Sequence, residues 1–122
     1  MSTKPEGKLW KKFKQITPEI SWTRIENTVA FGTPDLLGYN KNHNYFTVEM
    51  KVTKSKKLAI SAFQICYCHT HPVNHFILSE SLAPRSIKLY EGRQITELVE
   101  QGLELSPFRQ GWDEVREYLY RL

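Results

Sequence analysis

The sequence predicts one α/β domain, residues 1–122, in which a mixed central sheet is flanked by helices. Residues 5–16 place apolar side chains at helical spacing, which is the pattern of an amphipathic helix. Residues 45–52 alternate apolar and polar side chains, which is the period of a strand with one buried face. Residues 58–71 have the pattern of a second helix, and shorter strand patterns follow. A chain of this length can bury one modest core.

The first predicted helix, residues 5–16, begins with Pro5 and Glu6, which suit a helix's first turn. Its lysines lie opposite the apolar side chains. We expect Lys11 and its neighbours to lie along a phosphate backbone or to form a solvated surface. Pro18 ends this helix.

Residues 19–31 are rich in β-branched and aromatic side chains and predict the first strand. Arg24 and Glu26 share one face of it. Either Arg24 holds a phosphate and Glu26 acts as an outer carboxylate, or the two form a plain cross-strand ion pair.

Residues 35–39 and 45–52 predict an antiparallel hairpin around a turn rich in asparagine. In this register Asp35 lies opposite Glu49, with Cβ atoms roughly 5 Å apart. The same register pairs Leu37 with Thr47 and Tyr39 with Tyr45. Facing carboxylates destabilise a sheet unless a cation compensates them, and hard oxygen ligands suit Mg²⁺ or Mn²⁺. Lys51 points into the same site.

The loop after this hairpin carries Lys54, Lys56 and Lys57, which we interpret as phosphate contacts beside the site. In the helix expected over residues 58–71, Ser61 and Gln64 match a capping box.

Cys66 and Cys68, the only cysteines, are too close in sequence for a good internal disulfide, so reduced thiols are expected. Together with His69, His71 and nearby His75 they raise a second possibility, a small zinc-stabilised module. Ligands so close together on one helix converge poorly on a single ion.

The remaining elements are predicted from similar patterns. Residues 74–78 and 85–90 are typical of strands, and residues 94–101 of a short helix that ends at Gly102. Residues 112–122 predict a terminal helix. Its apolar stripe, which we expect to close the core, consists of Trp112, Val115, Leu119 and Leu122.

A Pro-Asp pair at residues 34–35 and Glu-Met-Lys at residues 49–51 resemble the motif of the PD-(D/E)XK nuclease superfamily. Residues 32–37, with Ser61 and Gln64 downstream, look most like its VRR-NUC branch of small phage-type nucleases. Archaeal Holliday-junction resolvases are a second relative. The resemblance implies a restriction-endonuclease-like αβββαβ core, extended here by C-terminal helices.

The resemblance also implies a site in which Asp35, Glu49 and the backbone carbonyl of Met50 hold Mg²⁺ or Mn²⁺. Gln64 would face this site and help to organise it. Glu6 would be an extra metal ligand or general base, unless it serves only the helix N-terminus. With Lys51 these groups would hydrolyse phosphodiester bonds of branched or duplex DNA, in a structure-selective or non-specific way. By analogy we expect a homodimer.

Charge is spread unevenly along the chain. Residues 91–122 hold seven acidic and four basic side chains, a net charge of −3. Since the whole chain carries +4, residues 1–90 carry a net charge of +7. This asymmetry favours a polyanionic partner. The alternative function is a nucleic-acid-binding protein with a nuclease-like fold that does not cleave.

No apolar run approaches the roughly 20 residues of a membrane span, and no signal-peptide pattern begins the chain. We therefore expect no membrane partner, and a cytoplasmic protein, or one of the host cytoplasm if it is viral.

Overall fold

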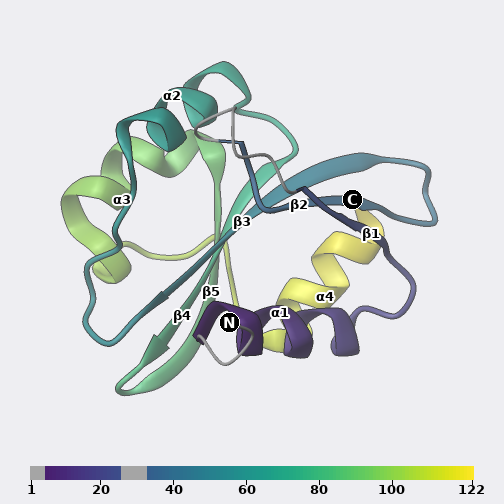
Figure 1. Cartoon of the computed structure of the whole chain (residues 1–122), viewed down its shortest axis with the longest axis horizontal. Coiled ribbons are helices and arrows are strands. Elements are labelled where there is room, and N and C mark those ends of the chain that lie inside the picture. The colour runs from purple at the N-terminus through teal and green to yellow at the C-terminus, as the bar shows by residue number, and fades with distance from the viewer. Residues whose placement is uncertain (1–4, 26–32) are drawn as a thin grey trace.

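A six-stranded mixed sheet forms the centre of the molecule, as seen in a computed structural model that describes residues 5–25 and 33–122 (Figure 1). The sheet has the strand order β1-β2-β3-β4-β5-β6. The strands are β1 (Ser21–Arg24), β2 (Leu36–Tyr39), β3 (Tyr45–Thr53), β4 (His75–Leu82), β5 (Arg85–Glu91) and β6 (Arg109–Gln110). The helices are α1 (Pro5–Ile16), α2 (Ala62–Thr70), α3 (Ile95–Gln101) and α4 (Trp112–Arg121), with the 3-10 helices η1 (Gly92–Gln94) and η2 (Gly102–Glu104) flanking α3. The predicted α/β class is confirmed.

The direction of the strands changes once within the sheet. β3 and β4 run parallel, joined through α2, and every other neighbouring pair is antiparallel. Two pairs of the predicted hairpin register are confirmed, Leu37 with Thr47 and Tyr39 with Tyr45. The predicted pair of Asp35 with Glu49 is not part of the ladder, because β2 begins at Leu36. The side chains of β3 therefore alternate between the two faces of the sheet in the expected order.

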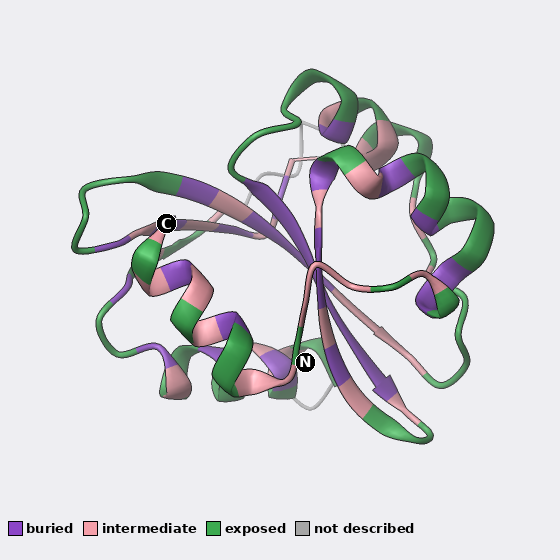
Figure 2. Cartoon of the chain, turned by 180° about the vertical axis from the view of Figure 1, so that it is seen from behind, coloured by how far each residue is buried: buried purple, intermediate pink, exposed green. Residues whose placement is uncertain are grey.

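Each face of the sheet has its own apolar cluster (Figure 2). One face packs against α1 and α4, whose buried side chains include Phe13, Val115 and Leu119. The other packs against α2 and α3 through a smaller cluster that includes Cys68 and Ile95. The stripe on α4 closes the larger cluster, as its sequence pattern predicted. None of the helices in the described residues has the length and apolar content of a bilayer-spanning segment.

Several boundaries differ from the predictions. The second helix begins at Ala62, because Ser61 caps its N-terminus with an extended backbone, so residues 58–60 are not helical. The first strand begins at Ser21 rather than at residue 19 and is described only to Arg24, and residues 26–31 of the prediction lie outside the described residues. The two-residue strand β6 was not predicted, since such a short strand leaves no alternation in the sequence.

The turn between β2 and β3 anchors the C-terminal helix. Asn40 is buried, and its side-chain amide donates to the carbonyls of Leu119 and Leu122 at 2.9 and 3.0 Å. Its side-chain oxygen accepts from the backbone N–H groups of Asn42 and Asn44. One side chain thus shapes the turn and satisfies carbonyls at the end of α4, which have no partner within the helix.

We predict that Asn40→Ala destabilises the protein by about 2–4 kcal/mol, because it leaves buried carbonyl and N–H groups without partners. For a chain of this size the melting temperature should fall by roughly 8 °C or more. Asn42→Ala is the matched control, since this exposed side chain makes only 3.4 Å contacts to the same helix end. Equal melting temperatures for the two variants would show that Asn40 does not anchor α4.

Candidate functional site

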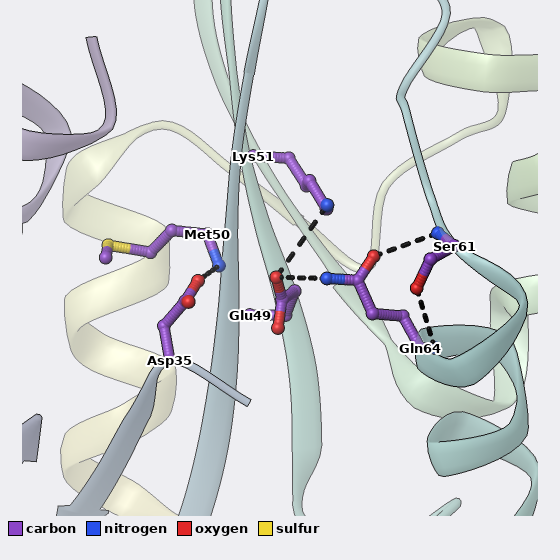
Figure 3. Close-up of polar contacts among 6 residues, drawn as sticks. All are labelled: Asp35, Glu49, Met50, Lys51, Ser61 and Gln64. Atoms are coloured by element: carbon purple, nitrogen blue, oxygen red, sulfur yellow. Dashed lines mark hydrogen bonds and ion pairs between the residues drawn. The ribbon is translucent and has the colours of Figure 1, made fainter. Parts of the chain in front are cut away.

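The site begins where β2 separates from β3. Pro34 precedes Asp35, and the last residue pair between the strands is Leu36 with Val48. The backbone carbonyl of Asp35 accepts from Ile25 N–H at 2.8 Å, which continues the β1–β2 ladder. Its carboxylate turns the other way, and Oδ2 accepts from Met50 N–H at 2.8 Å (Figure 3). The Asp35 side chain therefore takes a position in the β3 ladder that a backbone carbonyl would otherwise fill.

The carbonyl of Met50 lies on the same side of β3 as this N–H. In an extended strand the N–H and C=O of one residue point to the same neighbouring strand. Because β2 has already ended opposite Val48, the Met50 carbonyl faces the region of the Asp35 carboxylate.

Glu49 lies one residue earlier on β3, and its side chain is on the face covered by α2. It is only 7% exposed. Gln64 Nε2, from α2, donates to Glu49 Oε2 at 2.7 Å, and Lys51 Nζ lies 3.8 Å from the same oxygen (Figure 3). The structure thus brings together the three residues predicted from the strand pattern, Asp35, Glu49 and Lys51, and adds Gln64 from the following helix.

Gln64 forms the predicted capping box and also donates a hydrogen bond to Glu49. Its side-chain oxygen accepts from Ser61 N–H at 3.0 Å, while its backbone N–H donates to Ser61 Oγ at 3.1 Å, which completes the capping box. Its amide nitrogen remains available for Glu49. The cap holds the amide in the orientation that reaches the carboxylate.

The Asp35 and Glu49 carboxyl groups are close enough to shift each other's pKa. Burial, followed by the negative charge of Asp35, raises the pKa of Glu49 to about 8. Burial also raises the pKa of Asp35, and the Met50 N–H and the Lys51 ammonium oppose that shift. Two carboxyls placed together away from water are therefore most stable when they hold a proton or a cation between them.

Glu6, in the first turn of α1, is electrostatically coupled to this pair. Its side chain is largely exposed, and its pKa is raised by partial desolvation and then by the charge of Asp35. Lys51 and Arg24 oppose that shift. Glu6 and Arg24 are thus within electrostatic range of the site, whereas Glu26 lies outside the described residues.

The oxygen donors of the site fit a hard divalent cation. In the described part of the chain, no three His, Cys, Asp or Glu side chains come close enough together to hold one ion. The site instead combines the carboxylates of Asp35 and Glu49 with the carbonyl of Met50. Mg²⁺ is commonly held by one or two carboxylates, with water and substrate phosphate completing its coordination. Burial raises the pKa values of both carboxyls, and the charge of Asp35 raises that of Glu49 further, so a bound cation would offset the cost of ionising the pair.

The predicted phosphate-binding lysines are exposed. Lys54, Lys56 and Lys57 follow directly after β3, and Lys56 pairs with Glu104 at 3.5 Å. Lys11 is exposed on α1. The structure does not bring Lys11 or these loop lysines into the hydrogen-bonded cluster around Glu49.

The cysteines and histidines of α2 point in different directions. Cys68 is buried against the sheet, whereas Cys66 and His69 are exposed. His71, also exposed, stacks on Tyr67 with ring centroids 3.9 Å apart. A helix spreads residues this close in sequence around its circumference, so the geometry does not favour the zinc module.

His75 and Cys68 are neighbours of the site that sequence reasoning treated only as possible zinc ligands. Both line a small cavity together with Glu49 and Gln64. Burial lowers the pKa of His75 to about 4, and its Nδ1 lies 2.8 Å from Thr47 Oγ1. Burial and the charge of Glu49 raise the pKa of Cys68 to about 11. Both side chains are neutral at physiological pH and keep this side of Glu49 dry.

We predict that Glu49→Gln stabilises the protein at pH 8 in EDTA. The pKa of Glu49 is about 8 in the fold against 4.5 in the unfolded chain, so its contribution to stability is lost as pH rises between these values. His75 acts in the opposite direction below pH 6.5, so the range from pH 6.5 to 8.5 isolates the carboxyl pair. The free energy of unfolding of the variant should be higher by about 1 kcal/mol or more, which thermal melts would show as a melting temperature raised by roughly 4 °C.

The matched control is Glu97→Gln on the exposed side of α3, whose melting curve should follow the wild type at every pH. A Glu49→Gln variant that melts below the wild type at pH 8 would contradict the raised pKa.

Comparisons of the chain with protein-family models, with curated proteins and with solved structures found no match.

Proposed function

We propose that this protein is a Mg²⁺- or Mn²⁺-dependent nuclease that hydrolyses phosphodiester bonds in DNA. The observation that carries the proposal is the pairing of a half-buried Asp35 carboxyl with a buried Glu49 carboxyl, with the Lys51 ammonium beside Glu49. A protein with no use for a cation gains nothing from placing two carboxyls together in a partly buried site, because both lose solvation and repel each other.

The fold is compatible with the superfamily that the sequence resembles. The first elements of the chain follow one another as α1, β1, β2, β3, α2 and β4. This is the αβββαβ order that a restriction-endonuclease-like core requires. Asp35 directly precedes the second strand of this order, and Glu49 and Lys51 lie on the third, which is consistent with the proposal.

The residues that would hold the ion are Asp35, Glu49 and, through its backbone carbonyl, Met50. A bound divalent ion supplies charge neutralisation at the scissile phosphate and a more acidic water as nucleophile. Asp35 contributes an oxygen whose orientation is fixed by Met50 N–H. Gln64 fixes Glu49 in the same way, so both carboxylates are oriented before substrate arrives.

Lys51 is suited to stabilising negative charge. Its ammonium lies on the same face as Glu49, at the edge of the buried pair, where a phosphate group can approach. A positive charge here interacts more strongly with the pentacoordinate transition state than with the ground-state phosphodiester. Orienting the attacking water is a second role that this position allows.

The substrate we propose is branched or duplex DNA, cut in a structure-selective or non-specific manner. Lys54, Lys56 and Lys57 beyond β3 would contact phosphates, which contribute affinity without reading sequence. A chain of this size offers little surface for reading base edges. A homodimer, inferred by analogy, would present two such sites to two strands.

Labelled single-stranded, duplex, flapped and four-way-junction DNA should be cut in Mg²⁺ or Mn²⁺ and remain intact in EDTA. Asp35→Asn, Glu49→Gln and Lys51→Ala should each reduce the cleavage rate by at least about 100-fold, since each removes charge stabilisation at the phosphate. Gel analysis of the products measures this. Lys41→Ala and Asp113→Asn, at exposed positions away from the site, should cut like the wild type.

If the wild type binds these DNAs but cuts none of them in either metal, the alternative of a non-cleaving nucleic-acid-binding protein is correct. Cleavage that persists in Asp35→Asn and Lys51→Ala would show that catalysis lies elsewhere or in a contaminant.

Ser61→Ala and Gln64→Ala should separate the two roles of Gln64. Both break the capping box and should lower stability by about 1 kcal/mol. Only Gln64→Ala also removes the hydrogen bond to Glu49, so it should reduce cleavage about tenfold further than Ser61→Ala. Melting temperatures and cleavage rates of both variants test this. Equal loss of rate would mean that Gln64 acts only through the helix cap.

A further inference from the structure

The face of the sheet that carries Glu49 and Lys51 continues toward its far end as a polar surface. Lys51 pairs across the sheet with Ser79, which pairs in turn with Lys88. The next row is Thr53, Ser81 and Ser86. Residues paired directly across neighbouring strands point to the same face. Two rows of hydroxyl and ammonium groups therefore extend from the candidate site.

Three residues of these rows, Ser81, Ser86 and Lys88, line a pocket of about 340 Å³. Its walls are the loop of residues 54–57 and η2, which lie beside the end of the β4–β5 hairpin (Figure 1). The walls are joined, because Leu103 N–H donates to the carbonyl of Lys56 at 2.7 Å. Gly102 has φ +62°, and a Cβ there would lie 2.3 Å from the Lys56 carbonyl oxygen. The close approach of loop and η2 thus needs glycine, and the pocket is shaped in advance.

The lining of the pocket carries an excess of donors and positive charge. Lys88 is half-buried, and its Nζ donates to the carbonyl of Leu103 at 2.7 Å. In the described residues it has no ion pair with a carboxylate. Ser81 is buried and Ser86 half-buried. The only acidic side chain in the lining, Glu104, is exposed and already pairs with Lys56.

A half-buried ammonium without a carboxylate partner, beside serine hydroxyls in a preformed pocket, has the chemistry of a site for a phosphate group. Carboxylate or sulfate ligands would meet the same donors. The place of the pocket favours a phosphate of a nucleic-acid strand over these other anions. Lys88 lies on the same face as Lys51 and two strands away, which at the usual spacing of strands is about 10 Å.

We infer that this pocket binds a phosphate group of the DNA strand, next to the phosphate held at Asp35, Glu49 and Lys51. This inference rests on the proposed function for the identity of its ligand. The pocket would fix the position of the backbone and so set the distance between the bound phosphate and the cut.

The first experiment uses inorganic phosphate as probe and does not depend on cleavage. Titration followed by amide NMR should shift Ser81, Ser86 and Lys88. Lys88→Met, which keeps the length of the side chain, should weaken this binding at least about fivefold, while Lys41→Met should leave it unchanged. Ser86→Ala, a small change that keeps the Lys88–Leu103 bond, should weaken it about twofold. Absence of shifts at the pocket, or equal affinity in Lys88→Met, overturns the site.

The second experiment identifies the source of the phosphate. Single methylphosphonate linkages, which are uncharged, are placed at successive positions of an oligonucleotide, and affinity is measured in EDTA. One position should lower wild-type affinity about fivefold and have no effect in Lys88→Met. If inorganic phosphate binds but no position depends on Lys88, the pocket takes a free anion and the inference is wrong. Failure of the proposed nuclease function would appear separately, as strand binding without cleavage.

Discussion

The hydrogen bond from Met50 N–H to the Asp35 carboxylate is the interaction on which the rest of the site depends. The backbone carbonyl of Asp35 remains hydrogen-bonded to Ile25 beyond β1. The Asp35 side chain accepts the hydrogen bond that a backbone carbonyl of β2 would otherwise accept from Met50 of β3. The two strands can then part without leaving a buried N–H unsatisfied, whose cost would be about 1–3 kcal/mol. The opening that results is the place where the second carboxylate, Glu49, comes close to the first, and the carbonyl of Met50 lies on the Asp35 side of β3.

The two faces of the sheet have different tasks. The face toward α1 and α4 is almost wholly apolar and supplies most of the core. The opposite face is covered by α2 and α3 only over its centre, where Ile77 and Tyr90 are buried. Polar rows therefore lie beside this smaller cluster, from Glu49 and Lys51 to Lys88. The larger core carries the stability that allows charged groups to be placed at a partly buried site on the other side.

Burial rather than any single partner determines the electrostatics of the site. The neutral side chains of Cys68 and His75 border Glu49, so the carboxyl pair has little water on that side. Lys51 supplies one positive charge and the Gln64 amide supplies only a hydrogen bond. These contacts do not offset the cost of burial, so the pKa of Glu49 is about 8. Ionisation of both carboxyls at high pH would destabilise the fold, and a bound divalent cation would remove this cost. The same pair of side chains thus connects stability with the proposed chemistry.

The sequence by itself determined the order of the main elements, the register of the β2–β3 hairpin, and the grouping of Asp35, Glu49 and Lys51. These follow from local period and turn chemistry, which a chain carries in its neighbouring residues. It also indicated both uses of Gln64 but could not show that one amide serves them together. Only the tertiary structure decided that the Asp35 carboxylate accepts a hydrogen bond from Met50 N–H and that Cys68 and His75 border Glu49. It also decided that Lys88 lies in the same cross-strand row as Lys51. Such contacts join residues far apart in the chain through strand pairing and packing, and no local pattern records them.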